Sequence, residues 1–490
     1  MALVAVTHGA MSRLRLLAPA TALALAIPMA LFTTAAQAAV PSGGGTAAVT
    51  IDGATRYQQI SGFGASEAFG QAQTIMDAPS ATQKQVLNLL YSWTSGAGLT
   101  ILRNEISADA GSTIEPKAPS GPNATPTYLP LSSIDEDQGQ LWFAQKIKAE
   151  YGVTDVFADA WSAPAFMKTN HSADNGGAVC GVPGATCSSG DWRQAYANYL
   201  KQYAADYAAA GDRLTYVGPE NEADFGPDYD SMIMSPSQTA NFLDVLGPTM
   251  ATSGLGTRVE CCATEGWNYA AQYAAAIESD PVASRYVPVF TSHGYSGAPG
   301  SLLPGWTEPV WETEWSTFQS WDPAWDDGTT ASGFAWAQNI YTGLTAANLN
   351  AFLYWWGTST PSEGGDNESL VQVNGTTVNP SGRLWAFANY SRFVRPGAVR
   401  IGTSTSDGSL EVTAFGNVNG SVAVVVLNTA KTPQTAGFSL SQAGDGVLAT
   451  PYLTNASHDT AAQPALPVQQ GSFTATLPAR SLVTYQIPAA

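Results

Sequence analysis

Charged side chains are scarce in this sequence. Of 490 residues, 12% are charged, and 20 Lys or Arg stand against 39 Asp or Glu, which gives a formal net charge of -19. No Lys/Arg run occurs outside a short N-terminal segment. Binding to a nucleic acid or to an anionic membrane surface depends mainly on clustered cations, so the composition argues against both classes of partner. The surface must draw its polarity from uncharged side chains, and with aromatic residues at 10% this composition suits uncharged, hydroxyl-rich ligands.

Cysteine and histidine are also rare, with four of each. The histidines are scattered at positions 8, 171, 293 and 458 and no paired C-x-x-C motif occurs, so the sequence predicts no zinc site, and nothing in it implies an organic cofactor. Cys180 and Cys187 bracket the turn-rich stretch GVPGAT, and we expect them to form a local disulfide in an oxidising compartment. Cys261 and Cys262 are adjacent, and both a pair of buried thiols and a vicinal disulfide remain open.

Long apolar runs are missing beyond the N-terminus, so we expect no membrane span in the mature chain. Residues 11–38 (MSRLRLLAPATALALAIPMALFTTAAQA) combine two arginines, an apolar stretch and the small-x-small ending Ala36-Gln37-Ala38. This pattern predicts a secretory signal within residues 1–38, cleaved after Ala38, with Met11 as an alternative start. Pro28 and the cleavage motif disfavour a retained anchor, so we expect a secreted, extracellular protein.

Short apolar runs then alternate with amphipathic stretches. We expect eight strands, near residues 58–66, 99–105, 154–162, 214–222, 258–263, 287–295, 309–315 and 350–357. Helical patterns such as 81–95, 191–211 and 236–254 lie between them and end at Gly or Pro. This alternation predicts an α/β fold with a (β/α)8 TIM barrel over residues 58–390. An open doubly wound sheet is the alternative, but its Gly-rich nucleotide loop is matched only in part by SGFGAS.

The C-terminal region has a different texture. From about residue 395, apolar and small polar residues alternate between Asn-Gly and Gly-Ser turns without a helical period. This predicts an antiparallel β-sandwich over residues 391–490. The stretch TAAVTIDGATRYQQI has the same pattern, so residues 39–57 should supply a linker and one further strand of the sandwich. We expect a monomer.

Two acidic clusters stand at the predicted ends of barrel strands, where the chemistry of such barrels is located. Glu220 and Glu222 end the fourth strand, and Glu312 and Glu314 end the seventh. Two carboxyl groups flanking a sugar linkage hydrolyse it: one protonates the leaving oxygen, and the other attacks the anomeric carbon or activates water. A single acidic residue there is more often a loop charge or a helix cap, so the prediction depends on finding both clusters. Strand parity does not choose within either cluster.

Seven separated motifs resemble glycoside hydrolase family 30 of clan A: GFGASEAFG, ILRNEI, WSAPAFMKTN, ENEADF, SHGY, WETEW and SRFVRPGAVRI. The stretch from WSAPAFMKTN through CGVPGATCSSGDWRQAYANYL is most similar to subfamily 7, whose members are mainly xylanases and glucuronoxylanases. The resemblance implies a retaining β-xylanase that acts on xylan or xylo-oligosaccharides by double displacement, without a metal or cofactor. Alternatives are a β-1,6-glucanase or galactanase with the same chemistry, and a carbohydrate-binding protein without turnover.

The resemblance also assigns roles residue by residue. It makes Glu222 the acid/base and Glu314 the nucleophile. Asn221 would hold the sugar 2-hydroxyl, Arg103 would hydrogen-bond the nucleophile and keep it ionised, and Tyr295 would lie near it.

Further substrate-binding candidates are Trp161 and Trp355 (in preference to Trp356) as sugar-facing aromatics, Asn104 and His293 at strand ends, and Gln71. The family commonly has proline after the acid/base, where this chain has Ala223. Relatives that read glucuronic acid would have an arginine near Gln71. An amide cannot form the bidentate pair that a guanidinium makes with a uronate. Dependence on glucuronic acid branches therefore stays open beside plain or arabinose-decorated xylan, as does the choice between internal and terminal cleavage.

Overall fold

Parallel strands and helices alternate along most of the chain in the computed structural model, which describes residues 46–109, 111–131, 137–362, 367–441 and 446–489. The predicted secretory segment lies outside the described residues. No described helix is both long and apolar enough to span a membrane.

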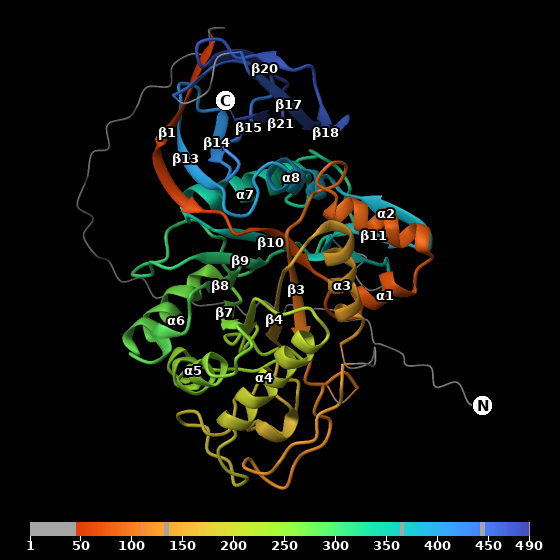
Figure 1. Ribbon diagram of the computed structural model, residues 1–490, viewed down its shortest axis with the longest axis vertical. Helices are drawn as coiled ribbons and strands as arrows, with labels where there is room; N and C mark the ends of the chain where they lie inside the picture. The colour runs from red at the N-terminus through yellow and green to blue at the C-terminus, as the bar shows by residue number, and fades with distance from the viewer. Residues whose placement is uncertain (1–45, 110, 132–136, 363–366, 442–445, 490) are drawn as a thin grey trace, which may run out of the picture. The chain divides into compact units, whose positions relative to one another are not determined.

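The parallel strands close into a barrel (Figure 1). Neighbours follow the order β6-β5-β4-β3-β2-β10-β9-β8-β7, and β6 and β7 are two parts of one strand interrupted at Glu260, so the sheet returns on itself. The strands are β2 (Gly62–Ser66), β3 (Ile101–Ile106), β4 (Asp155–Ala160), β5 (Tyr216–Gly218), β6 (Arg258–Val259), β7 (Cys261–Thr264), β8 (Phe290–His293), β9 (Val310–Glu314) and β10 (Ala351–Ser359). The predicted (β/α)8 barrel is confirmed, and the open doubly wound sheet is excluded.

Helices connect the strands. They are α1 (Gln71–Asp77), α2 (Ser80–Tyr91), α3 (Gln140–Tyr151), α4 (Arg193–Ala209), α5 (Pro236–Ala251), α6 (Trp267–Ser279), α7 (Gly333–Ala346) and α8 (Gly382–Ser391). A hairpin of β11 (Ser369–Asn374) and β12 (Thr377–Pro380) extends the sheet beside β10. Local residues determine where α5 begins. Pro236 occupies its first turn, and the Gln238 side chain accepts a hydrogen bond from Ser235 N–H (2.8 Å).

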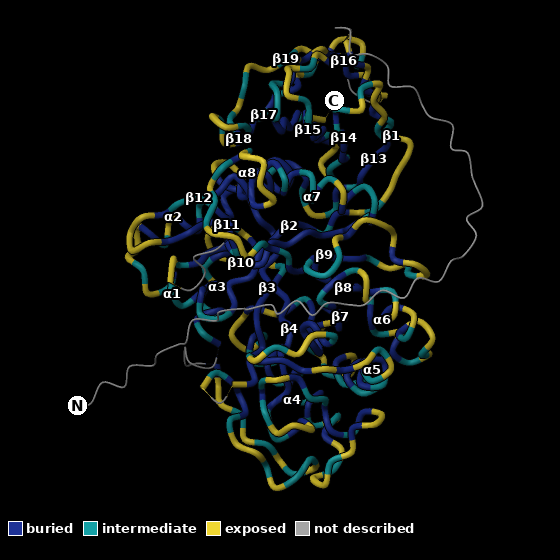
Figure 2. Tube along the Cα trace, turned by 180° about the vertical axis from the view of Figure 1, so that it is seen from behind, coloured by how far each residue is buried: buried dark blue, intermediate teal, exposed yellow. Residues whose placement is uncertain are grey.

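Strand alternation sorts the barrel interior into layers. Ile101, Phe157 and Trp311 belong to an apolar cluster that fills the interior near the beginnings of the strands. Two residues further along, the same faces of β3 and β4 carry Arg103 and Asp159, which are fully buried and hydrogen-bonded to each other (2.6 Å). Figure 2 shows these central strands buried, with exposed segments mainly on the outer helices and loops. The polar layer therefore lies on the apolar one, toward the carboxyl ends of the strands.

The C-terminal sheet has the order β18-β17-β21-β15-β14-β13-β1-β16-β20, with β19 beside β17. Its strands are β1 (Ala47–Gln59), β13 (Val399–Thr405), β14 (Leu410–Gly416), β15 (Val422–Asn428), β16 (Gln434–Leu440), β17 (Leu448–Asn455), β18 (His458–Ala462), β19 (Leu466–Pro467), β20 (Ser472–Leu477) and β21 (Ser481–Ile487). The N-terminal strand joins this sheet as predicted. The sheet is mixed rather than wholly antiparallel, because β1 pairs with β13 antiparallel but with β16 parallel.

Helices α7 and α8 face the C-terminal sheet (Figure 1). Arg480 forms an ion pair with Asp326 of the barrel (2.7 Å), and Thr484 on β21 donates to the backbone carbonyl of Asn389 on α8 (2.6 Å). These polar contacts join the sandwich to the side of the barrel and leave the carboxyl ends of the barrel strands to the loops.

Burial makes Glu67, in the loop after β2, a probe of pH-dependent stability. Its carboxyl accepts a hydrogen bond from Thr358 (2.6 Å), and desolvation raises its pKa from 4.5 to about 8. Between these pH values the unfolded chain has released a proton that the folded chain keeps. Stability from this group is therefore full at low pH and is lost as the pH rises toward the folded pKa, at about 1.4 kcal/mol per pKa unit at most. We expect the melting temperature to fall from about pH 5 to about pH 8, and Glu67→Gln to reduce that fall.

Thermal unfolding followed by circular dichroism at several pH values measures the effect. The exposed Glu278→Gln on α6 is the control and should leave the slope unchanged. Identical slopes for Glu67→Gln and the wild type would show that Glu67 does not retain its proton in the folded state.

Candidate active site

Two carboxylates from different strands meet at the end of the barrel. Glu222 lies in the loop after β5, and Glu314 is the last residue of β9. One oxygen of each, together with a ring nitrogen of His293, lie within 4.8 Å of one another. Both glutamates are 6% exposed, so they are nearly desolvated yet reachable from one side. The predicted glycosidase chemistry depends on this convergence of Glu222 and Glu314.

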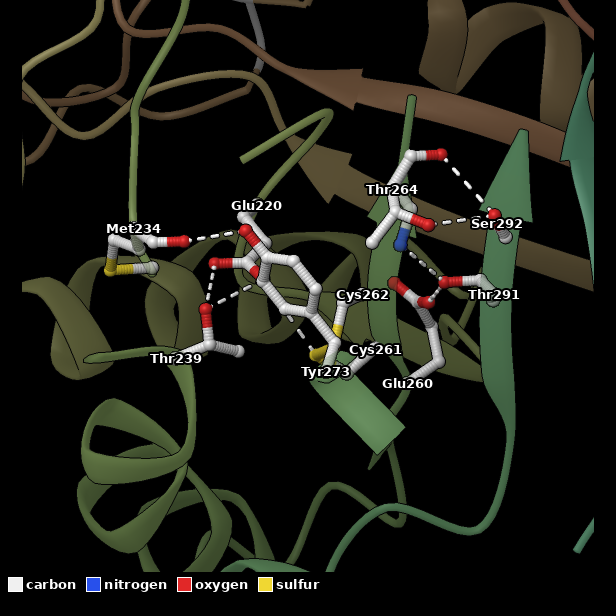
Figure 3. Close-up of a disulfide and its surroundings, with 11 residues drawn as sticks. Glu220, Met234, Thr239, Glu260, Cys261, Cys262, Thr264, Tyr273, Thr291 and Ser292 are labelled. Atoms are coloured by element: carbon white, nitrogen blue, oxygen red, sulfur yellow. Dashed lines mark hydrogen bonds between the residues drawn. A yellow bond between two sulfur atoms is a disulfide. The ribbon is translucent and has the colours of Figure 1, made fainter. Parts of the chain in front are cut away.

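Glu220 and Glu222 both lie in the loop after β5, but their side chains have different surroundings. Because β5 ends at Gly218, strand alternation no longer applies beyond it. Glu222 has a left-handed backbone (φ 49°), and its N–H donates to the carbonyl of Ala263 (2.7 Å). Glu220 instead accepts hydrogen bonds from Thr239 of α5 (2.9 and 3.0 Å), as Figure 3 shows. Only Glu222 therefore faces Glu314.

On β9, a register shift places Glu312 and Glu314 in different surroundings. Ser292 of β8 pairs with Glu312, but the next residue, His293, pairs with Glu314, so an extra residue bulges between them. Glu312 accepts from Trp267 Nε1 of α6 (2.7 Å). Glu314 accepts from Arg103 instead. The bulge therefore gives the two glutamates different partners in spite of their equal parity.

Arg103 is the main source of positive charge at the site. Its guanidinium donates to Glu314, to Asp159 (2.6 Å) and to Asn221 Oδ1 (2.5 Å), and is fully buried. Burial raises the pKa of Glu314 above its ordinary value, the charge of Glu222 adds to this, and Arg103 opposes it. Without the guanidinium, the buried carboxyl would hold its proton to still higher pH.

His293 and Tyr295 each contact one of the two carboxyls. His293 Nδ1 lies 3.1 Å from Glu222 Oε1, and burial lowers the pKa of His293 to about 4, so its imidazole is neutral near pH 7. Tyr295 donates its hydroxyl to Glu314 Oε1 (2.8 Å). Burial and the charge of Glu314 raise the pKa of Tyr295 well above its ordinary value, so the phenol keeps the proton that it donates.

Aromatic rings border the carboxylates. Trp161 and Trp355 have ring centroids 5.8 Å apart and lie over the Arg103 guanidinium at 4.5 and 5.9 Å. Phe69 packs edge-on against both, at 5.5 and 6.0 Å. Trp356 stacks behind Trp355. Of Trp355 and Trp356, Trp355 is thus the one beside Arg103. This is the ring that we expected on the cleft side.

Three predicted substrate-binding residues are placed differently by the structure. Asn104 follows Arg103 on β3, so alternation turns it outward, where it donates to Tyr207 of α4 (2.9 Å). Gln71 begins α1 and is only 1% exposed, which removes its amide from the open cleft. His293 is fully buried behind Glu222. Strand ends carry outward side chains as well as cleft-facing ones, and Asn104 is one of the outward ones. Contact of Gln71 and His293 with substrate stays a prediction.

Sequence reasoning missed Asp159, the partner of Arg103, although it shares the strand parity of Trp161. It also missed Phe69 and Tyr229, whose rings lie 6.4 Å apart beside Trp161 and Trp355. Aromatic loop residues have no spacing signal, so only their tertiary position identifies them.

Both cysteine pairs are disulfides. Cys180–Cys187 closes the predicted local loop, and Cys261–Cys262 forms a vicinal bridge on β7, which decides the alternative that the sequence left open (Figure 3). Both Cys261 and Cys262 are buried beside Glu220.

The trio Glu222, His293 and Glu314 has the composition and closeness of a metal site. Two of the lone pairs of Glu314 are already directed at hydrogen-bond donors, those of Arg103 and Tyr295. A carboxylate held by a guanidinium and a phenol is arranged for attack on an electrophile rather than for binding a second cation. The geometry therefore supports acid/base and nucleophilic chemistry.

Known proteins share this architecture. The Glycosyl hydrolase family 30 TIM-barrel domain matches residues 60–308, and the family's beta sandwich domain matches residues 397–485. The catalytic domain of GH30 xylanase C from Talaromyces cellulolyticus is 43% identical, with a TM-score of 0.83 over 90% of this chain and 100% of that one. Lysosomal acid glucosylceramidase of Mus musculus is 25% identical over 78% of this chain and 77% of its own length. Glucuronoxylanase XynC of Bacillus subtilis (strain 168) is 23% identical over 72% of this chain and 79% of its own length.

The family matches fall on the two parts of the fold that the structure separates, the barrel and the C-terminal sheet. Because the barrel match alone spans half of the chain, the protein belongs to glycoside hydrolase family 30.

Proposed function

We propose that this protein is a retaining β-xylanase that hydrolyses the β-1,4-linked backbone of xylan by double displacement. The observation that carries the chemistry is the approach of Glu222 and Glu314 oxygens within 4.8 Å. Retaining glycosidases hold their two carboxyl groups about 5–5.5 Å apart, whereas inverting enzymes need about 6.5–9.5 Å to admit a water. The observed approach supports the retaining mechanism.

In this mechanism Glu314 is the nucleophile. Arg103 and Tyr295 stabilise its carboxylate. Its attack on C1 forms a glycosyl-enzyme as the bond to the leaving oxygen breaks, and Glu222 supplies the proton to that oxygen. Glu222 then takes a proton from the water that releases the sugar. Asn221 uses its carbonyl oxygen on Arg103 (2.5 Å), which leaves its amide N–H groups for the 2-hydroxyl.

The proposed substrate class rests on the 43% identity to a GH30 xylanase, which covers the whole of that domain. The aromatic rings of Trp161 and Trp355 near Arg103 suit the apolar face of a sugar ring. The two disulfides agree with export from the cell, which we also propose on the basis of the N-terminal segment.

We further propose that glucuronic acid branches are not required. Recognition of a uronate needs an available cation, best supplied by arginine. Arg103 directs its donors at Asp159, Glu314 and Asn221. Lys168, in the loop after β4, directs its ammonium at Ser162 Oγ and two backbone carbonyls (2.5 to 2.8 Å). Gln71 is uncharged and buried.

Reducing-sugar release from purified polysaccharides tests this function. Glucuronoxylan, arabinoxylan, unsubstituted xylan, a β-1,6-glucan and a β-1,6-galactan would be compared, together with glucosylceramide in detergent. We expect hydrolysis of the three xylans, with rates on glucuronoxylan and unsubstituted xylan within about tenfold, because Arg103 and Lys168 already direct their donors at protein groups. NMR of the first product should show the β-anomer.

Other outcomes select the alternatives. Hydrolysis of the β-1,6-linked polymers or of glucosylceramide alone would replace the substrate but keep the chemistry. Binding of xylan without any product would identify a carbohydrate-binding protein. An α-anomer as first product would contradict double displacement.

A further inference from the structure

Two carboxyl groups below the active site approach each other without an intervening donor. Glu260 stands between β6 and β7 and is fully buried, as is Asp159. Among the described residues, Glu260 Oε1 and Asp159 Oδ1 have no hydrogen-bond partner. Both crowd Gly218: a methyl group on its Cα would lie 1.8 Å from Glu260 Oε1 and 2.1 Å from Asp159 Oδ1. Two oxygens this close to one point are direct neighbours.

The second oxygen of each carboxyl group already accepts a hydrogen bond. A proton shared by the two groups must therefore lie between the remaining oxygens. Asp159 Oδ2 accepts from Arg103 Nε (2.6 Å). Thr291 Oγ1 accepts from Ala263 N–H (2.8 Å), so its own proton is directed at Glu260 Oε2 (2.5 Å), as Figure 3 shows. Two carboxylate oxygens can only accept hydrogen bonds. One proton between Oε1 and Oδ1 therefore completes every bond in the network.

That proton belongs to Glu260. Burial raises the pKa of Glu260 well above its ordinary value, and the negative charge of Asp159 and the bond to it raise it further. Asp159 is the member of the pair that forms an ion pair with the guanidinium of Arg103 (2.6 Å). A neutral Glu260 then donates to Asp159.

We propose that Glu260 is a protonated positioning residue that connects both catalytic glutamates; this inference rests on the roles of Glu222 and Glu314 proposed above. One arm runs through Asp159 to Arg103, which holds Glu314.

The second arm runs through Thr291 to the N–H of Ala263, whose carbonyl accepts from Glu222 N–H (2.7 Å). Glu222 and Ala263 both have left-handed backbones (φ 49° and 45°), which L-residues adopt only when their surroundings hold them. Protonated Glu260 thus holds the side chain of Arg103 through its donated proton on one arm, and the backbone of Glu222 through its acceptor oxygen on the other.

The variants Glu260→Gln and Glu260→Leu test whether the hydrogen bonds of Glu260, rather than the volume of its side chain, position the catalytic groups. A glutamine keeps an N–H for Asp159 and an acceptor for Thr291, so kcat should stay within about threefold of the wild type. Leucine removes both, and kcat should fall by about 10²-fold at nearly unchanged KM, because Glu260 does not touch substrate and a misplaced catalytic group affects mainly the chemical step. Glu67→Gln, another buried carboxyl in the barrel, is the control and should keep full activity.

Circular dichroism and the melting temperature show whether each variant is folded. A folded Glu260→Leu enzyme with full kcat, or a Glu260→Gln enzyme as impaired as the leucine variant, would overturn the proposal. The proton has its own readout: the infrared difference between wild type and Glu260→Gln near neutral pH should contain the absorption of a protonated carboxyl, and a carboxylate absorption in its place would refute it. This measurement needs no substrate, so it remains decisive even if the proposed function fails.

Discussion

Glu314→Gln is expected to lower kcat/KM by about 10⁴-fold or more, because an amide cannot form the covalent glycosyl-enzyme. The surroundings of Glu314 make the loss severe. Arg103 and Tyr295 both point donors at this side chain. A glutamine keeps one acceptor oxygen for these two donors and loses the negative charge that faces Arg103. Initial rates on the wild-type enzyme's substrate measure the loss.

Glu312→Gln is the matched control for this prediction. Glu312 lies two residues earlier on the same strand and is fully buried, but it accepts from Trp267. Burial raises the pKa of Glu312 well above its ordinary value, so the group is a neutral acid and an amide replaces it with little change. We expect kcat/KM within about threefold of the wild type. A large loss in Glu312→Gln combined with activity in Glu314→Gln would reverse the assignment made from the register shift.

The effect of Glu222→Ala should depend on the leaving group. On xylan, where the departing sugar oxygen needs a proton, we expect a loss of about 10²- to 10⁴-fold, the usual contribution of a general acid. On an aryl glycoside with a strongly acidic phenol, the glycosyl-enzyme should still form, and its hydrolysis should become limiting because no base activates water. Added azide needs no base, so it should accelerate turnover and yield the β-glycosyl azide.

Chromatography of the azide reaction, with Glu220→Gln as the matched control, tests this second role. Glu220 accepts hydrogen bonds from Thr239 of α5, so its amide variant should hydrolyse xylan at close to the wild-type rate and form no glycosyl azide. A loss in Glu222→Ala that is equal for all leaving groups, or no rescue by azide, would remove the acid/base role from Glu222.

Much of the fold could be predicted because it depends on local patterns. Eight apolar runs separated by helical stretches predict the barrel, and the change of period near residue 395 predicts the second sheet. The ends of the strands do not follow from these patterns. The predicted strand 214–222 shortens to β5 (Tyr216–Gly218), because Pro219 and the left-handed residue Glu222 end regular pairing. The parallel pairing of β1 with β16 was also missed, because alternation indicates a strand but not its partner.

Only part of the candidate site could be predicted, because local patterns do not specify tertiary neighbours. The resemblance to the family indicated Glu222, Glu314, Arg103 and Tyr295, and the structure brings these four together. Asn104 failed as a cleft residue because its neighbour Arg103 occupies the inward face of β3. Residues that act through others, rather than on substrate, have no local pattern by which to be found.

The amino-acid sequence by itself determined that this chain forms a barrel with a second β domain and belongs to one family of glycoside hydrolases, because periodicity and motifs are carried by residues close together in the chain. Only the tertiary structure decided which glutamate of each cluster faces the other. It did so through a loop that ends strand alternation at Gly218 and a bulge between Glu312 and Glu314. It also decided where one proton is held below them, since Asp159 and Glu260 belong to separate strands and meet only when the barrel closes.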